Sequence, residues 1–189
     1  MVPLNVPNVL TVVRMLLVPV LVVALLEKTG GNDLLAGIVF AVASLTDYID
    51  GYLARSRNSV TTFGKLMDPI ADKLLIVAAL VALVSLNRLE AWVAMVVIAR
   101  EFAVTVLRVA AGTQQGVVIP ASQFGKLKTA TQVLMVMGLI AFHPRPLAIT
   151  LLVYVTVVVT VLSGADYFFG RRRRLVESAP VRTGGRAGT

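Results

Sequence analysis

Four aspartates stand close together in a strongly apolar chain, at Asp47, Asp50, Asp68 and Asp72. An unpaired carboxylate costs roughly 2.5–3.5 kcal/mol at the centre of a membrane helix, so four of them require neutralisation. Carboxylate oxygens are hard ligands that suit Mg²⁺ or Mn²⁺. Two divalent cations would match the charge of the four aspartates, which predicts a two-metal site.

The spacing of these aspartates fits two neighbouring helices. At about 100° per residue, the first pair shares one helix face with Gly51 and Ala54, which leave room for a bulky group to approach the backbone. Asp68 and Asp72 are four residues apart and are therefore neighbours on the next helix. Because proline is tolerated in a first helical turn, we expect this helix to begin only shortly before Pro69.

The short polar loop 56–62 brings the two pairs of aspartates together near one membrane surface. The alternative is a set of interfacial salt bridges with Arg55, Lys65 and Lys73. That alternative suits one or two acids better than four at this spacing.

The arrangement closely resembles the signature of the CDP-alcohol phosphotransferase family, D-x2-D-G-x2-A-R-x8-G-x3-D-x3-D. All eight fixed positions are met, by Asp47, Asp50, Gly51, Ala54, Arg55, Gly64, Asp68 and Asp72. The resemblance implies that an alcohol hydroxyl attacks the β-phosphorus of a CDP-linked lipid and that CMP leaves. It implies Asp47, Asp50 and Asp68 as metal ligands. Asp72 would help to hold the second metal and would act as the general base.

The N-terminal segment also resembles the family. On its own, Asn8 would be a helix cap and Pro7 a helix start. In the family context, Pro7-Asn8-Val-Leu-Thr11 is similar to the P-N-x-x-T segment that lies against the cytidine nucleotide. The implied nucleotide pocket consists of Asn8, Thr11, Asp47, Gly51, Arg55 and Thr61.

Basic residues in two later apolar spans predict a phosphate site. Glu101 and Arg108 are seven apart and can form an internal salt bridge, which would leave Arg100 without an acidic partner. A buried lone arginine calls for an anion. Lys126 and Lys128 open the next span, where the ordinary explanation is positive-inside charge. Together, Arg100, Arg108, Lys126 and Lys128 predict a site for the phosphate of a phosphorylated alcohol.

These basic segments and the longer N-terminal pattern N-x-P-N-x-L-T-x-x-R resemble the phosphatidylglycerophosphate synthase branch of the family. That branch implies CDP-diacylglycerol as donor and sn-glycerol 3-phosphate as acceptor. Phosphatidylinositol-phosphate synthases and CDP-lipid-using cardiolipin synthases share the catalytic motif and remain alternatives. A carboxylate-based transporter is a remote alternative, because the acids lie near the membrane edge and no internal repeat is seen.

Composition indicates the elements that carry these residues. The chain has 189 residues, of which 57% are hydrophobic and 15% charged, against about 45–50% and about 25% in soluble domains. It is therefore expected to be an all-α integral membrane protein with six transmembrane helices. The expected spans are 10–26, 34–53, 66–86, 91–111, 122–142 and 147–169.

The basic residues also predict topology and domains. They gather in loops on one side and in the run 171–174, which places the aspartates and both termini in the cytoplasm of a multi-pass cell-membrane protein. Residues 1–170 are the expected catalytic membrane domain, and 171–189 a basic, disordered tail.

We expect membrane lipids and no nucleic acid as partners, and the family resemblance implies a homodimer. The absence of cysteine excludes disulfides and thiolate metal sites.

Overall fold

The computed structural model describes residues 6–27, 32–57, 62–115 and 123–177, with side chains chiefly within 12–27, 33–46, 73–107 and 127–166. All regular secondary structure in this part of the chain is helical, as the composition predicts. Each expected apolar span coincides with one helix. The helices are α1 (Val6–Leu26), α2 (Asn32–Arg57), α3 (Thr62–Ser85), α4 (Ala91–Gln115), α5 (Gln123–Ala141) and α6 (Leu147–Glu177).

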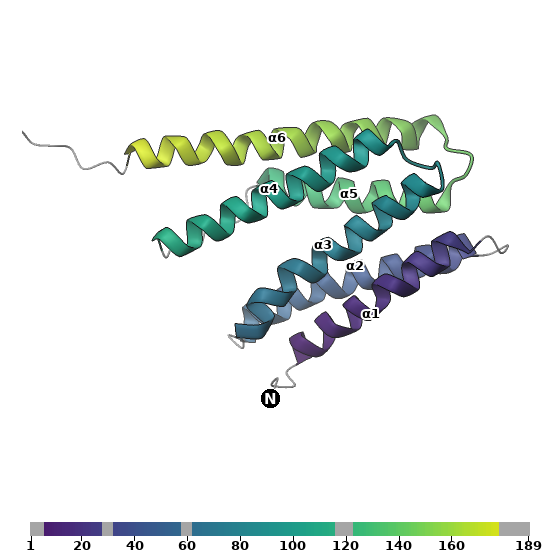
Figure 1. Ribbon diagram of the computed structural model, residues 1–189, viewed down its shortest axis with the longest axis horizontal. Coiled ribbons are helices and arrows are strands. Elements are labelled where there is room, and N and C mark those ends of the chain that lie inside the picture. Colours follow the sequence, from purple (N-terminus) through teal and green to yellow (C-terminus); the bar gives the residue numbers. More distant parts are fainter. Residues whose placement is uncertain (1–5, 28–31, 58–61, 116–122, 178–189) are drawn as a thin grey trace, which may run out of the picture.

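The helices form two groups of three along the chain (Figure 1). In the first group α1 packs against both α2 and α3, and in the second group α6 packs against both α4 and α5. The groups are joined by contacts of α2 with α5 and of α3 with α4. The α3–α4 connection lies where the groups are closest, and α3 and α4 diverge toward the opposite end (Figure 1).

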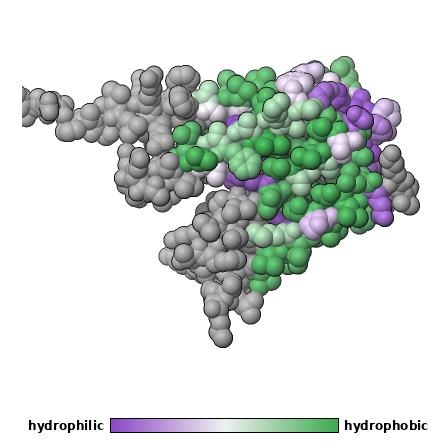
Figure 2. All heavy atoms as spheres, in the orientation of Figure 1, coloured by the Kyte–Doolittle hydropathy of each residue, from purple (hydrophilic) through white to green (hydrophobic). Residues whose placement is uncertain are grey.

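Apolar side chains occupy both the inside and the outside of the bundle. Phe40, Leu80 and Leu83 are completely buried in the core between the two groups. On the outside, Leu34 is 71% exposed and Leu147 is 73% exposed, and apolar residues cover much of the face in Figure 2. A soluble protein rarely exposes a continuous apolar surface of this kind, whereas helices in a lipid bilayer do.

One helical stretch in the described part of the chain is long and apolar enough to cross a membrane by itself. It covers 147–166 in α6 and has a mean hydropathy of 2.3. Shorter apolar stretches cover 12–26, 33–46, 73–85 and 127–141. In α4, Arg100 and Glu101 interrupt the apolar run midway along the helix.

The turn after α3 shows why this helix ends where it does. Asn87 has a φ of 56°, in the left-handed region that asparagine tolerates better than most residues. The amide of Arg88 donates to the carbonyl of Leu83, and the amide of Asn87 donates to the carbonyl of Val84. These two bonds form a Schellman motif, which satisfies carbonyls at the C-terminal end of α3 and reverses the chain toward α4.

Two ion pairs hold the same end of the bundle, called here the ion-pair end. Arg88 donates to both carboxylate oxygens of Asp33 at 2.9 Å, and it also donates to the carbonyl of Ile140 at 3.3 Å. It therefore links the α3–α4 turn to the first turn of α2 and the last turn of α5. Arg145 donates to both oxygens of Glu90 at 2.7 and 3.1 Å, which joins the connections that precede α4 and α6.

Two expectations about helix ends are wrong. The start of α3 at Thr62 places two turns of helix before Pro69, so this proline lies beyond the first turn. A proline inside a helix is tolerated where neighbouring helices and local adjustments satisfy the freed carbonyl. In addition, α6 continues to Glu177, so 171–177 are helical rather than part of a disordered tail. Arginine is a good helix former, and the run simply extends a helix already nucleated in the apolar span.

The Glu90–Arg145 pair makes a pH-dependent contribution to stability. The hydrogen bonds from Arg145 hold the pKa of the Glu90 carboxyl below its ordinary value, and the same contact raises the pKa of Arg145. Glu90 therefore stabilises the fold above the carboxyl pKa of the unfolded chain and loses this effect as the pH falls through its lower folded value. We expect Glu90→Gln to lower the thermal unfolding midpoint at neutral pH. In acid, the midpoints of the variant and of the unmodified protein should become equal. A constant difference at all pH values would contradict this assignment.

Candidate active site

The backbone brings the four predicted metal-binding aspartates to one end of the first helix group. Asp47 and Asp50 lie in the second half of α2, and Asp68 and Asp72 lie in the first half of α3. Because α2 ends at Arg57 and α3 begins at Thr62, both aspartate-bearing segments lie at the end away from the α3–α4 turn (Figure 1). The side chains of the four aspartates are outside the described residues.

This placement fits the metal ions that the aspartates imply. Four carboxylates on adjoining halves of two neighbouring helices offer the hard oxygen ligands that Mg²⁺ and Mn²⁺ take. Among the side chains that the structure describes, no group of three or more histidines, aspartates and glutamates is placed to hold a metal.

A second polar group lies in the other half of the bundle, at about the same distance along the helices from the ion-pair end as Asp72. At about 1.5 Å per residue, Asp72 lies ~20 Å from the end of α3 at Ser85, and Lys128 lies ~20 Å from the end of α5 at Ala141. Both of these helix ends belong to the ion-pair end. The aspartate-bearing helix α3 contacts α5, the helix that carries Lys128. The aspartates and this second group therefore lie on neighbouring helices.

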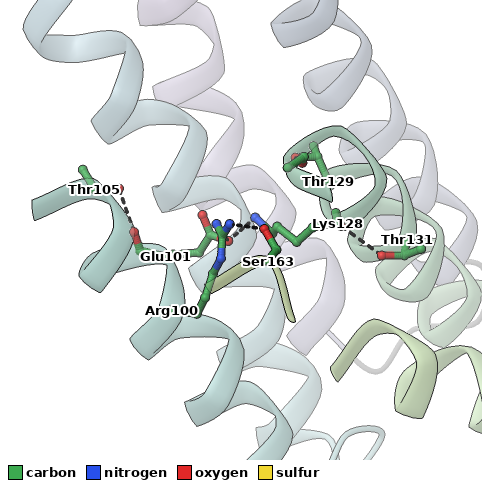
Figure 3. Close-up of polar contacts among 8 residues, drawn as sticks. Arg100, Glu101, Thr105, Lys128, Thr129, Thr131 and Ser163 are labelled. Atoms are coloured by element: carbon green, nitrogen blue, oxygen red, sulfur yellow. Dashed lines mark hydrogen bonds and ion pairs between the residues drawn. The ribbon is translucent and has the colours of Figure 1, made fainter. Parts of the chain in front are cut away.

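Arg100, Glu101, Lys128 and Ser163 form the second group, called here the cation cluster (Figure 3). Lys128 of α5 donates a hydrogen bond to Glu101 Oε1 of α4. Arg100 Nη1 lies 3.6 Å from the same carboxylate oxygen. Arg100 Nη2 donates to Ser163 Oγ of α6 at 2.6 Å. One carboxylate and one hydroxyl thus join α4, α5 and α6.

The cation cluster is buried, which makes its charges strongly coupled. The side chains of Arg100, Glu101 and Lys128 are 15%, 12% and 7% exposed. Removing one partner of a buried ion pair costs about 3–5 kcal/mol, because the other charge is left without compensation. Two cations from two helices thus lie beside one carboxylate oxygen in a buried position.

Backbone carbonyls and a glycine support the cation cluster. Thr131 donates to the carbonyl of Lys128 at 3.0 Å, and Thr156 of α6 donates to the carbonyl of Thr131 at 3.2 Å. These bonds fix α5 against α6 next to the lysine. Gly164 lies beside the Arg100 stem, where a Cβ would be 3.4 Å from Arg100 Cγ, an ordinary contact distance.

The structure corrects one step of the sequence interpretation. The sequence interpretation allowed a Glu101–Arg108 salt bridge that would leave Arg100 without an acidic partner. The side chain of Arg108 is outside the described residues, but the Glu101 carboxylate lies beside both Arg100 and Lys128, so Arg100 does have an acidic partner. The reason is tertiary, because Lys128 approaches from α5 and its ammonium needs a carboxylate in this buried position.

Other predicted site residues can be located only by their helices. Asn8 and Thr11 lie in α1, Gly51 and Arg55 in α2, Arg108 in α4 and Lys126 in α5. Their side chains are outside the described residues, and Thr61 lies outside the described chain altogether.

Sequence reasoning missed Ser163 as a member of the cation cluster. A signal for Ser163 was available, because Thr156, Thr160 and Ser163 recur every three or four residues along an otherwise apolar span. All three are buried, so they form a polar stripe that faces the neighbouring helices.

Comparison with known proteins agrees with the motif. The CDP-alcohol phosphatidyltransferase family matches residues 4–162. The chain is 43% identical to the CDP-diacylglycerol–glycerol-3-phosphate 3-phosphatidyltransferase of Bacillus subtilis, over 87% of this chain and 93% of that protein. It is 41% identical to a probable phosphatidylglycerophosphate synthase of Mycobacterium tuberculosis, over 86% and 79% of the two chains. It is 34% identical to a Rickettsia felis protein that has the same name as the Bacillus subtilis protein, over 87% of this chain and 93% of that protein.

The eight-position motif is carried by the adjoining halves of α2 and α3. The family match extends over most of the chain, and the relatives align with it over nearly their whole length. The chain therefore belongs to the CDP-alcohol phosphatidyltransferase family.

Proposed function

We propose that this protein transfers the phosphatidyl group of CDP-diacylglycerol to sn-glycerol 3-phosphate, giving phosphatidylglycerophosphate and CMP. The observation that carries the proposal is a buried pair of cations, Arg100 and Lys128, on helices that pack beside the aspartate-bearing helix α3. A phosphorylated alcohol can place its phosphate on the cations and its hydroxyl toward the aspartates. The names of the Bacillus and Rickettsia relatives specify the same two substrates.

In the proposed reaction, the acceptor hydroxyl attacks the β-phosphorus of the CDP-lipid. The bond from this phosphorus to the oxygen that bridges the two phosphates breaks, and CMP leaves. Asp72 takes the hydroxyl proton as the attack develops. The family resemblance assigns Asp47, Asp50, Asp68 and Asp72 to two Mg²⁺ or Mn²⁺ ions, which when bound neutralise charge on the attacking and leaving oxygens.

The other predicted site residues divide into a set for the CDP-lipid donor and a set for the acceptor phosphate. Asn8, Thr11, Asp47, Gly51, Arg55 and Thr61 hold the CDP end of the donor, as the family resemblance implies. Arg100, Arg108, Lys126 and Lys128 hold the acceptor phosphate. A guanidinium suits a phosphate because its planar donors match two oxygens at once.

We propose that all six helices cross the cell membrane, with the aspartates and both termini in the cytoplasm. The exposed apolar surface and the excess of basic loop residues on the aspartate side support this topology. The catalytic membrane domain is 1–170, and the basic segment beyond it lies on the cytoplasmic side next to anionic lipid. The family resemblance further implies a homodimer.

The proposed function is tested by supplying purified protein with CDP-diacylglycerol and one acceptor at a time. We expect CMP release with sn-glycerol 3-phosphate in the presence of Mg²⁺. Inositol phosphate, serine and phosphatidylglycerol should give little CMP, and EDTA should abolish release until Mg²⁺ is restored. Product only with inositol phosphate or only with phosphatidylglycerol would replace the acceptor that we propose. CMP release unaffected by EDTA would contradict the two-metal assignment.

The base role of Asp72 predicts a specific defect. Asp72→Asn keeps the size of the side chain but cannot accept the hydroxyl proton, so turnover should fall by a factor on the order of 10²–10⁴. Binding of the CDP-lipid should survive, as measured by equilibrium binding of labelled donor. Asp33→Asn, which removes a carboxylate at the ion-pair end, is the matched control and should keep turnover. Near-normal turnover in Asp72→Asn would exclude this residue as the base.

Arg100 predicts a defect confined to the acceptor. Replacing it with glutamine removes a charge-assisted contact, so the KM for sn-glycerol 3-phosphate should rise on the order of tenfold to a hundredfold. The KM for CDP-diacylglycerol should change little. Arg88→Gln also removes a part-buried arginine, but at the ion-pair end, and it should leave both KM values unchanged. An equal rise in the two KM values of Arg100→Gln would indicate a general loss of structure instead.

A further inference from the structure

Glu101 stands out as a carboxylate within a site proposed to bind an anion. A negative charge beside a phosphate is unfavourable, so its presence requires a compensating benefit. Glu101 Oε1 meets Lys128 Nζ through a hydrogen bond and lies 3.6 Å from Arg100 Nη1. A single oxygen atom therefore contacts the cations of two different helices.

The benefit is that Glu101 keeps two like charges together in a buried place. Arg100 and Lys128 are close enough to repel each other electrostatically. Without a carboxylate between them, long flexible side chains would turn apart toward more polar surroundings. With the Glu101 carboxylate between them, the Arg100 guanidinium and the Lys128 ammonium are held beside the same oxygen atom before any ligand binds.

Ser163 restricts the same arginine from the other side. Its hydroxyl accepts a hydrogen bond from Arg100 Nη2 at 2.6 Å, while Nη1 faces Glu101. Two contacts on the two terminal nitrogens fix the plane of a guanidinium. Because an arginine recognises phosphate through the orientation of that plane, its fixation reduces the ordering cost of ligand binding.

We propose that Glu101 is a positioning residue for the acceptor phosphate, and that Ser163 assists it by orienting Arg100. The inference rests on the proposed function. Glu101 touches no substrate in this role and acts through the two cations. The purely structural alternative is that the cation cluster only ties α4, α5 and α6 together.

The two alternatives differ in which kinetic constant changes. With Glu101→Gln we expect the KM for sn-glycerol 3-phosphate to rise about tenfold, since one charge-assisted contact is lost. The KM for CDP-diacylglycerol should stay within about twofold. Glu101→Asp keeps the charge and should give an acceptor KM between those of the unmodified protein and Glu101→Gln. Ser163→Ala, which removes a hydroxyl and no charge, should raise the acceptor KM about threefold.

Glu90→Gln is the matched control, because it removes a carboxylate from the Arg145 ion pair at the opposite end of the bundle. It should lower thermal stability without changing the acceptor KM. A double variant, Glu101→Gln with Lys128→Gln, should raise the acceptor KM by less than the product of the two single effects, because Glu101 acts partly through that lysine.

Two results would overturn the positioning role. One is an unchanged acceptor KM in both Glu101→Gln and Ser163→Ala, and the other is an equal rise in the KM of donor and acceptor. A failure of the proposed function would look different, since the unmodified protein would then form no product from sn-glycerol 3-phosphate.

Discussion

Every charge inside this apolar helix bundle must meet an opposite charge, and the arrangement of the helices follows from that constraint. At the ion-pair end, Arg88 meets Asp33 and Arg145 meets Glu90. At mid-depth, Glu101 meets both Lys128 and Arg100. Apart from the contact between the neighbouring residues Arg100 and Glu101, these ion pairs join segments far apart in the sequence, because a buried charge needs a partner that reaches it.

The two ends of the bundle use this constraint differently. At the ion-pair end the charges cancel in pairs, and a Schellman motif completes the backbone hydrogen bonds of the α3–α4 turn. Charges that cancel leave nothing for a ligand to neutralise, so this end holds the helices in place. In the cation cluster, one carboxylate lies beside two cations from two helices, and such a pair of cations suits a phosphate.

Local patterns were sufficient for the helices and for the proposed catalytic motif. Apolar runs of about 20 residues allow only helices in lipid, since every backbone group must be satisfied within its own segment. Local reasoning was wrong where neighbouring structure intervened. It placed the start of α3 just before Pro69, and it ended the ordered chain before Arg171 although α6 continues to Glu177. In both places, packing or an existing helix outweighs a local preference.

The sequence by itself determined the family, the helical class and the chemistry proposed for the aspartates, because these depend on residue types at fixed separations along one or two adjacent helices. Only the tertiary structure decided how the later basic residues are used. Lys128 of α5 reaches Glu101 of α4, and Ser163 of α6 contacts Arg100 of α4, so both contacts depend on how those helices pack. Helical spacing cannot reveal such a meeting, since it relates residues only within one helix.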